Sequence, residues 1–211
     1  MKSLTKKVLS LILLFAVFGF SHCLIAQTTL TAEQVAQKTA SVISNAKGLT
    51  ASFSIQGNGN SGAGTIKSSG NKFQVILPGV GIWYNGKNLY TYSGRSNETT
   101  LVSPTAAELL ESNPLLYLKS GGGGYKYSFS SVKRNGKYVV EAAPKNGKGD
   151  IKKMTFTVNS SSFKPERIVV TTRQGTITIE IKDLKTNVAI NANEFEYPKS
   201  KYPKAEIVDL R

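Results

Sequence analysis

The sequence LTASFSIQ at residues 49–56 decides the fold class of this chain. Apolar and polar residues alternate strictly along it, with the apolar set at Leu49, Ala51, Phe53 and Ile55. Because successive side chains of a strand point to opposite faces of a sheet, this pattern predicts a β-strand with one buried face. The residues before it repeat apolar positions every three or four residues instead, so the chain changes from helix to sheet just before this stretch.

Further strands are predicted by the same alternation and by the turn residues between them. They are expected at 62–68, 72–77, 81–84, 88–92, 125–133, 137–143, 151–158, 165–172, 175–185 and 194–197. Asn85-Gly86 and Asn135-Gly136 are the dipeptides most typical of tight hairpins. About eleven strands with few helices predict a mainly β (α+β) protein built on one curved antiparallel sheet or a barrel.

Two helical segments accompany these strands. Thr31-Ala32-Glu33-Gln34 has the spacing of a capping box, and Lys47-Gly48 predicts a basic last turn and the end of that helix. Ser103-Pro104 predicts the N-cap and first residue of a helical insertion that continues to Leu118. Consecutive glycines then predict a flexible hinge, at Gly121, Gly122, Gly123 and Gly124.

Residues 1–26 have the parts of a cleavable signal peptide. Three lysines precede an apolar run at 8–20, which is shorter than a comfortable transmembrane helix. Cleavage after Ala26 leaves a mature domain of residues 27–211 outside the cytoplasm. A lipoprotein signal would instead retain Cys23 as an acylated N-terminus and make the protein a membrane-anchored acceptor.

Cleavage after Ala26 also removes the single cysteine and the single histidine of the chain. The mature protein then forms no disulfide, no metal site built on Cys or His, and no Ser-His-Asp or Cys-His catalytic arrangement. An enzyme would depend on serine and lysine or on carboxylates, of which the candidates are Glu108, Glu111, Glu194 and Glu196. We expect these carboxylates to be solvated and the protein to have no catalytic residue, metal or cofactor.

The chain is strongly basic, with 27 lysine and arginine residues, 13 aspartate and glutamate residues and a formal net charge of +14. A field of this sign attracts nucleic acids, anionic membranes or acidic proteins. The lysines occur in ones and twos, as at Lys152-Lys153, and form no block of five or more. This dispersion predicts a soluble surface and no nucleic-acid partner.

The motifs together resemble the LolA-type periplasmic lipoprotein carriers over essentially the whole mature chain. They are the hairpin YNGKNLYTY at 84–92, the Asn113-Pro114 of the helical insertion and the C-terminal Phe195-Glu196-Tyr197-Pro198. The family typically has Asp-Gly-Lys-x-Leu-Trp-x-Tyr at the hairpin and Phe-x-Phe-x-Pro near the end. Its Arg-Pro after the second strand, where the Arg helps to latch the lid, is replaced here by Lys67-Ser68-Ser69-Gly70.

The resemblance implies an incomplete antiparallel β-barrel of about eleven strands, covered by the N-terminal helix and by the helical insertion as a lid. It also implies a periplasmic carrier that takes lipoprotein acyl chains, or a related lipid, from an inner-membrane release complex to an outer-membrane acceptor. We expect a monomer.

The predicted ligand site is an apolar cavity between the curved sheet and these helices. On the predicted strand phase, its lining residues are Phe53, Ile55, Ile66, Phe73, Val75, Leu77, Trp83, Leu109, Leu110 and Leu116. The alternative is a non-carrier binding or sensor protein of the envelope, in which the same residues fill a packed core.

Overall fold

The strands form one twelve-stranded sheet. The computed structural model describes residues 29–57, 59–113, 115–119, 124–130, 135–147 and 149–211. The strands are β1 (Leu49–Gly57), β2 (Asn60–Ser69), β3 (Lys72–Leu77), β4 (Val80–Tyr84), β5 (Leu89–Ser93), β6 (Glu98–Val102), β7 (Tyr125–Phe129), β8 (Lys137–Pro144), β9 (Ile151–Asn159), β10 (Pro165–Thr172), β11 (Thr176–Thr186) and β12 (Glu206–Asp209).

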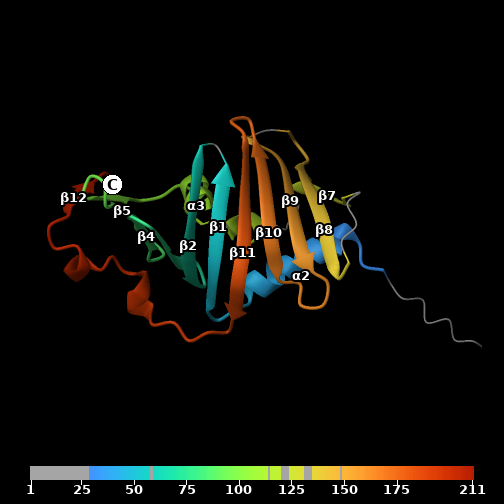
Figure 1. The fold of residues 1–211 in the computed structure, drawn as a ribbon, viewed down its shortest axis with the longest axis horizontal. Coiled ribbons are helices and arrows are strands. Elements are labelled where there is room, and N and C mark those ends of the chain that lie inside the picture. The colour runs from blue at the N-terminus through green and yellow to red at the C-terminus, as the bar shows by residue number, and fades with distance from the viewer. Residues whose placement is uncertain (1–28, 58, 114, 120–123, 131–134, 148) are drawn as a thin grey trace, which may run out of the picture. The chain divides into compact units, whose positions relative to one another are not determined.

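The order of the strands leaves the sheet open. It runs β12-β6-β5-β4-β3-β2-β1-β11-β10-β9-β8-β7, so β12 and β7 are the two edges and no barrel closes. Among the described strands, only the β12–β6 pair is parallel. The strands β1 and β11 run up and down in Figure 1, whereas β4 and β5 run across it, which shows how strongly the sheet twists.

Helix α2 (Ala32–Ser44) begins at the predicted capping box. The Thr31 hydroxyl accepts a hydrogen bond from the Gln34 backbone N–H (3.2 Å), and the Gln34 side chain accepts one from the Thr31 N–H (2.9 Å). The helix ends at Ser44, so the predicted basic last turn is wrong and Lys47 lies beyond the helix. Gly48 is required for another reason, because a Cβ there would lie 2.1 Å from the Val188 carbonyl oxygen.

The three α-helices of the described residues lie on one side of the sheet, behind the strands in Figure 1. We call this side the helix-covered face and the other side the outer face. Helix α2 contacts β7, β8 and the short helix α4 (Leu116–Lys119), which in turn contacts α3 (Ala106–Ser112). The buried stripe of α2 has helical spacing and consists of Ala32, Val35, Ala36, Thr39 and Ile43. Among the described residues, no helix is both long and apolar enough to span a membrane.

The C-terminal segment 187–205, which we call the C-terminal strap, covers the outer face of β3–β6. It contains the 3-10 helices η1 (Ala192–Phe195), which contacts β3, and η2 (Lys199–Lys201). Its rings pack on those of the sheet: Tyr197 and Tyr202 lie edge-on to Trp83, with centroids 5.5 and 5.9 Å away. Aromatic contacts of this kind attach the strap to the sheet.

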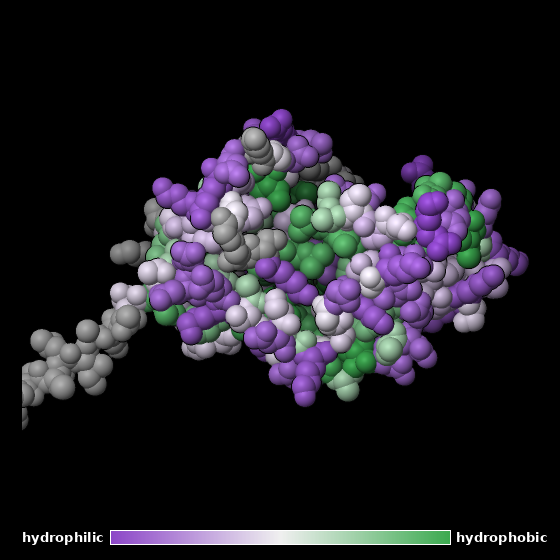
Figure 2. Space-filling view, turned by 180° about the vertical axis from the view of Figure 1, so that it is seen from behind, coloured by the Kyte–Doolittle hydropathy of each residue, from purple (hydrophilic) through white to green (hydrophobic). Residues whose placement is uncertain are grey.

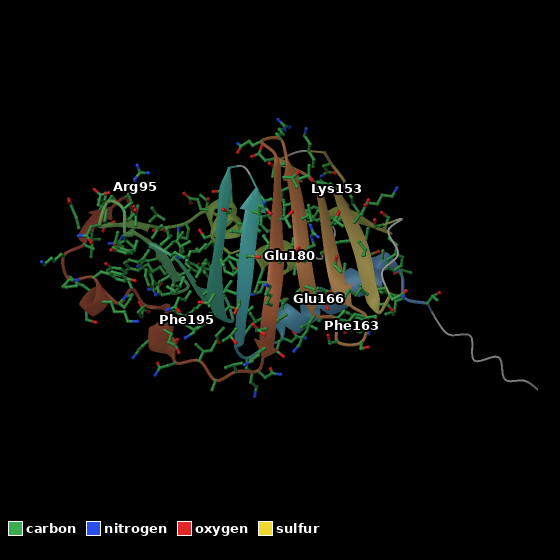
Figure 3. The ribbon with its side chains drawn as sticks, viewed as in Figure 1. Arg95, Lys153, Phe163, Glu166, Glu180 and Phe195 are labelled. Atoms are coloured by element: carbon green, nitrogen blue, oxygen red, sulfur yellow. The ribbon has the colours of Figure 1, made fainter. Side chains whose placement is uncertain are left out.

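The outer face of β8–β11 is polar. Figure 3 shows Lys153 and Glu180 on this side of the sheet. Arg167 Nε lies 3.1 Å from a Glu180 carboxylate oxygen, and Lys153 Nζ lies 3.7 Å from a Glu141 carboxylate oxygen. Such partly exposed pairs add little stability, so they mark a solvated surface.

The mainly β fold with few helices is confirmed, and ten of the eleven predicted strands are present within one or two residues at most boundaries. The predicted 125–133 strand is described only as far as Phe129 before a gap in the described residues. The predicted 194–197 strand is wrong, because these residues form η1 and the turn after it. Strands β6 and β12 were not predicted.

We expect Gly81→Ala to destabilise the fold, because Gly81 lies under the indole ring of Trp83. A Cβ at Gly81 would lie 2.1 Å from the ring, which is buried and cannot move aside freely. Overpacking of this kind costs about 1–3 kcal/mol. Urea denaturation followed by circular dichroism measures the change.

Gly62→Ala is the matched control on strand β2, which β3 separates from β4 in the sheet. A Cβ at Gly62 meets Leu77 at an ordinary 3.5 Å, so its unfolding free energy should stay within about 0.5 kcal/mol of the parent. Equal destabilisation by the two substitutions would contradict the close packing of Trp83 on Gly81.

Candidate functional site

The helix-covered face has an apolar floor, and strand register fixes which residues belong to it. In the β1–β2 and β2–β3 ladders, Ala51 pairs with Ile66 and Ile66 pairs with Val75, so these side chains point to the same face. The same parity extends through β11, where Phe53 pairs with Ile181 and Ile55 with Ile179. Six of the predicted lining residues therefore share the helix-covered face: Phe53, Ile55, Ile66, Phe73, Val75 and Leu77.

Trp83 is the exception, and its predicted place in the cavity is wrong. Val75 pairs with Ile82 and Gln74 with Trp83, so Ile82 faces the helices and Trp83 points to the outer face. There it is 1% exposed beneath the C-terminal strap. The prediction assigned the side chains of β4 to the wrong faces of the sheet. The turn between β3 and β4 fixes which residues of β4 face the helices, and the local sequence pattern does not reveal it.

The floor is only partly covered. Ile55, Leu77 and Ile82 remain half-buried, whereas Phe53, Ile66 and Val75 are buried. Gly62 stands between Ile55 and Leu77 without a side chain of its own. Figure 2 shows hydrophobic side chains in a hollow near the middle of this face, bordered by hydrophilic residues. An apolar surface open to water in this way is suited to an apolar ligand.

Helices α3 and α4 lie over this floor as the predicted insertion. Helix α3 buries none of its residues, and its Leu109 and Leu110 are half-buried. In and beside α4, Leu115 and Leu118 are buried and Leu116 is half-buried. Few buried apolar contacts of this kind are typical of elements that open locally.

The N-terminus of α3 differs from the prediction. Its N-cap is Thr105 and not Ser103, because the Thr105 hydroxyl accepts from the Glu108 N–H and the Glu108 carboxylate accepts from the Thr105 N–H at 2.7 Å. These hydrogen bonds lower the pKa of Glu108, which keeps it ionised in a structural role. Pro104 therefore precedes the helix instead of beginning it.

Lys119 connects α4 to the sheet. Its ammonium group donates a hydrogen bond to the Gly70 carbonyl oxygen at the β2–β3 turn, at 3.0 Å. Burial lowers the pKa of this lysine. The contact occurs at the Lys67-Ser68-Ser69-Gly70 stretch, the place where the resemblance implies a latching arginine in the family, so α4 contacts the sheet here without an arginine.

The predicted glycine hinge falls mostly outside the described residues. Of the four glycines, Gly121, Gly122 and Gly123 are outside them. Gly124 is exposed, and a Cβ there would meet no atom within 4 Å. Its surroundings therefore impose no requirement for glycine.

Tyrosines line the end of the helix-covered face near α4 and β7. Tyr117 on α4 lies near Tyr125, whose ring centroid is 6.5 Å from that of Tyr127. Burial raises the pKa of all three phenols. The nearby charges of Glu111 and Tyr125 raise the pKa of Tyr117 further. Those of Tyr125 and Glu33 do the same for Tyr127. These residues were not predicted, although the alternation of Tyr125, Tyr127 and Phe129 was a signal for one shared face.

Three of the four carboxylates considered for catalysis have structural partners. Glu194 forms an ion pair with Lys67, and Glu196 accepts a hydrogen bond from the Asn85 side chain at 2.9 Å. Glu108 caps α3. The described part of the chain contains no group of three or more His, Cys, Asp and Glu side chains placed to hold a metal ion.

Several solved structures are similar to this chain. An uncharacterized conserved protein from Thermus thermophilus superposes with a TM-score of 0.58 at 11% identity, covering 84% of this chain and 98% of that one. A LolA superfamily protein from Nitrosomonas europaea has a TM-score of 0.43 at 13% identity, covering 80% of this chain and 99% of that one. LprF from Mycobacterium bovis has a TM-score of 0.45 at 14% identity, covering 79% of this chain and 96% of that one. The first likeness supports the fold alone. No curated protein matches the sequence significantly.

The family follows from sequence. Residues 22–175 match the model of the family described as outer membrane lipoprotein carrier protein LolA. Because this match spans well over half of the chain, the protein belongs to that family.

The raised tyrosine pKa values predict a loss of stability in alkali. In the unfolded chain these phenols ionise near their ordinary pKa of 10.0, before they do in the folded protein, so the unfolding free energy should fall as the pH rises above about 10. Tyr117→Phe should flatten this decline. Urea denaturation between pH 8 and 11 measures it.

Below pH 9 the difference in unfolding free energy between the parent and Tyr117→Phe should stay constant, because the phenols are protonated in both the folded and the unfolded protein. The same alkaline slope in the parent and the variant would contradict the burial of Tyr117 beside Tyr125.

Proposed function

We propose that this protein is a periplasmic carrier of lipoprotein acyl chains, or of a related lipid, which it moves from the inner to the outer membrane. The observation that carries the proposal is the half-buried apolar floor of Ile55, Leu77 and Ile82 beneath a helix that buries none of its own residues. Membership of the LolA family supports the same function.

The energetics of this site suit capture of an alkyl chain. Each buried methylene gains roughly 0.8 kcal/mol, so a chain that replaces water on the floor is held firmly. The gain is non-directional and needs few polar contacts, which agrees with a floor of aliphatic side chains. Release then depends on an acceptor that buries the chain better, such as an outer-membrane partner.

Entry of the ligand would move α3 away from the floor. Its capping box keeps the helix formed as a unit, while its half-buried Leu109 and Leu110 leave little packing to break. The Lys119–Gly70 hydrogen bond tethers α4 to the β2–β3 turn, so α3 moves and α4 stays with α2. The lid therefore opens at the α3 end.

No chemical step forms part of the proposal. Cleavage of residues 1–26 would remove the only cysteine and histidine. Three of the four candidate carboxylates, Glu108, Glu194 and Glu196, serve as a helix cap or as ion-pair and hydrogen-bond partners. The carrier would comprise residues 27–211 as a monomer. Its positive net charge would favour approach to anionic membranes and to acidic surfaces of the release complex and acceptor.

Native mass spectrometry of the mature chain, purified from the periplasm without detergent, tests the function. We expect a monomer that carries lipid or lipopeptide adducts. An apolar fluorescent probe such as N-phenyl-1-naphthylamine should bind saturably and be displaced by a diacylated lipopeptide. Absence of both adducts and saturable binding would favour the alternative of an envelope sensor with a filled core.

Ile55→Gln should weaken probe binding about tenfold, because it places an amide on the apolar floor. Ile76→Gln is the matched control: Ile76 is also a half-buried strand isoleucine but points to the outer face, since it pairs with Gly81 and not with Ile82. Equal weakening by the two variants would place the probe elsewhere.

A further inference from the structure

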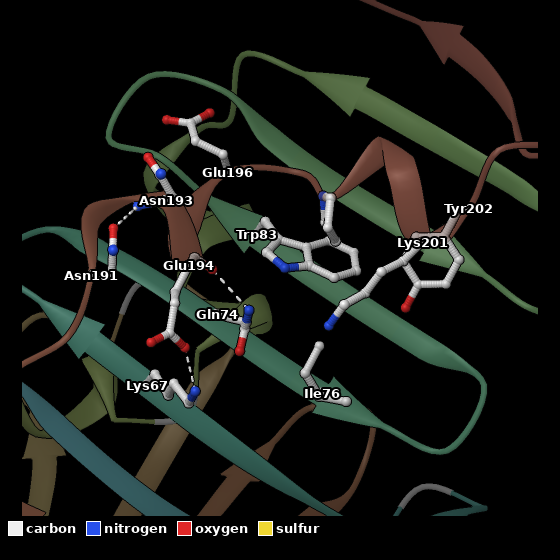
Figure 4. A pocket seen from close by; sticks show the side chains of 11 residues that line it. Lys67, Gln74, Ile76, Trp83, Asn191, Asn193, Glu194, Glu196, Lys201 and Tyr202 are labelled. Atoms are coloured by element: carbon white, nitrogen blue, oxygen red, sulfur yellow. Dashed lines mark hydrogen bonds and ion pairs between the residues drawn. The ribbon is translucent and has the colours of Figure 1, made fainter.

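A second cavity lies on the outer face, between strands β2–β4 and the C-terminal strap (Figure 4). Its volume is about 440 Å³, which lies in the range of sites for small organic molecules. Its lining residues are Lys67, Gln74, Ile76 and Trp83 from the sheet and Asn191, Asn193, Glu194, Glu196, Pro198, Lys201 and Tyr202 from the strap. The sheet separates it from the helix-covered face, so it is distinct from the proposed acyl-chain site.

The indole N–H of Trp83 is an unused donor in this cavity. Its nitrogen is buried and has no hydrogen-bond acceptor among the described residues. The residue is 1% exposed, so bulk water does not replace the missing acceptor. Figure 4 shows the nitrogen on the side of the ring that faces Gln74. A buried donor without an acceptor costs free energy, which a bound acceptor would recover.

The charges around the cavity also leave donors unused. Glu194 is neutralised by Lys67, and its backbone carbonyl accepts from the Gln74 amide at 2.8 Å. Glu196 accepts from the Asn85 side chain outside the cavity. Lys201 is exposed at the rim and has no carboxylate partner within the described residues. Glu194 is therefore ion-paired and Glu196 is hydrogen-bonded by an uncharged side chain, whereas the Lys201 ammonium and the Trp83 indole N–H have no partner among the described residues.

From these groups we infer that the outer-face cavity binds a small organic oxyanion, a phosphate or carboxylate carried on a compact polar molecule. The Trp83 N–H and the Lys201 ammonium donate to its oxygens, and charge-assisted hydrogen bonds of this kind are strong. Ile76 and Tyr202 provide an apolar wall for its carbon atoms. The oxyanion belongs to a free molecule or to a lipid headgroup, which offer the same chemistry.

Nuclear magnetic resonance gives a direct test, because Trp83 is the only tryptophan of the chain and has a single indole N–H resonance. The mature ¹⁵N-labelled protein is titrated with glycerol 3-phosphate, with dihexanoyl phosphatidylglycerol and with glycerol as the neutral control. We expect a saturable shift of the indole resonance with a phosphate ligand and none with glycerol. A shift with glycerol 3-phosphate identifies a free-molecule site, and a shift with the lipid alone identifies a headgroup site.

Two matched variants distinguish binding in the outer-face cavity from general attraction of the anion to a basic protein. Lys201→Met should weaken binding by at least about tenfold, since it removes a charged hydrogen-bond donor. Lys204→Met removes the same charge from the exposed strap outside the cavity and should leave the affinity unchanged. Equal losses in the two variants, a shift with glycerol, or no shift with either phosphate ligand would overturn the inference.

Discussion

The pairing of Val75 with Ile82 in the β3–β4 ladder determines how both faces of the sheet are used. It directs Ile82 toward the helices and Trp83 toward the C-terminal strap. A shift of one residue would exchange these two sets, because side chains alternate along a strand. The apolar floor under the lid and the aromatic cluster under the strap are therefore consequences of one register. Gly81 supports that register by leaving space for the indole ring.

The two faces are covered in different ways. On the outer face, the rings of Trp83, Tyr197 and Tyr202 pack closely and leave the tryptophan almost wholly buried. On the helix-covered face, α2 is anchored by a buried stripe, whereas α3 buries nothing. Stability is thus concentrated in α2 and the strap, and the part of the molecule above the floor is held more weakly. This division suits local opening of α3 while the sheet keeps its form.

Much of this arrangement was predictable from local pattern. Alternation at residues 49–56 and the Asn85-Gly86 turn are local signals, and both identified strands that the structure contains. The phase of β4 was missed because it depends on the geometry of the turn before it. Strand β12 was missed because four residues form a strand only through pairing with β6, which is distant in sequence. Phe195 and Tyr197 show a strand-like alternation, but they belong to the strap, and tertiary contacts with Trp83 and Thr99 decided their structure.

The order of the strands has a consequence for the way the chain folds. The first strand, β1, pairs with β11, and β6 pairs with β12 at the C-terminus. Both pairings join parts of the chain that are far apart in sequence, and such contacts form slowly because a long loop must first be closed. The β1–β6 meander therefore remains incomplete until the last quarter of the chain is present. Only then can β11 pair with β1 and β12 pair with β6. Until then β1 and β6 each have an unpaired edge. The strands β11 and β12 must therefore be present before these edges are protected from pairing with other molecules.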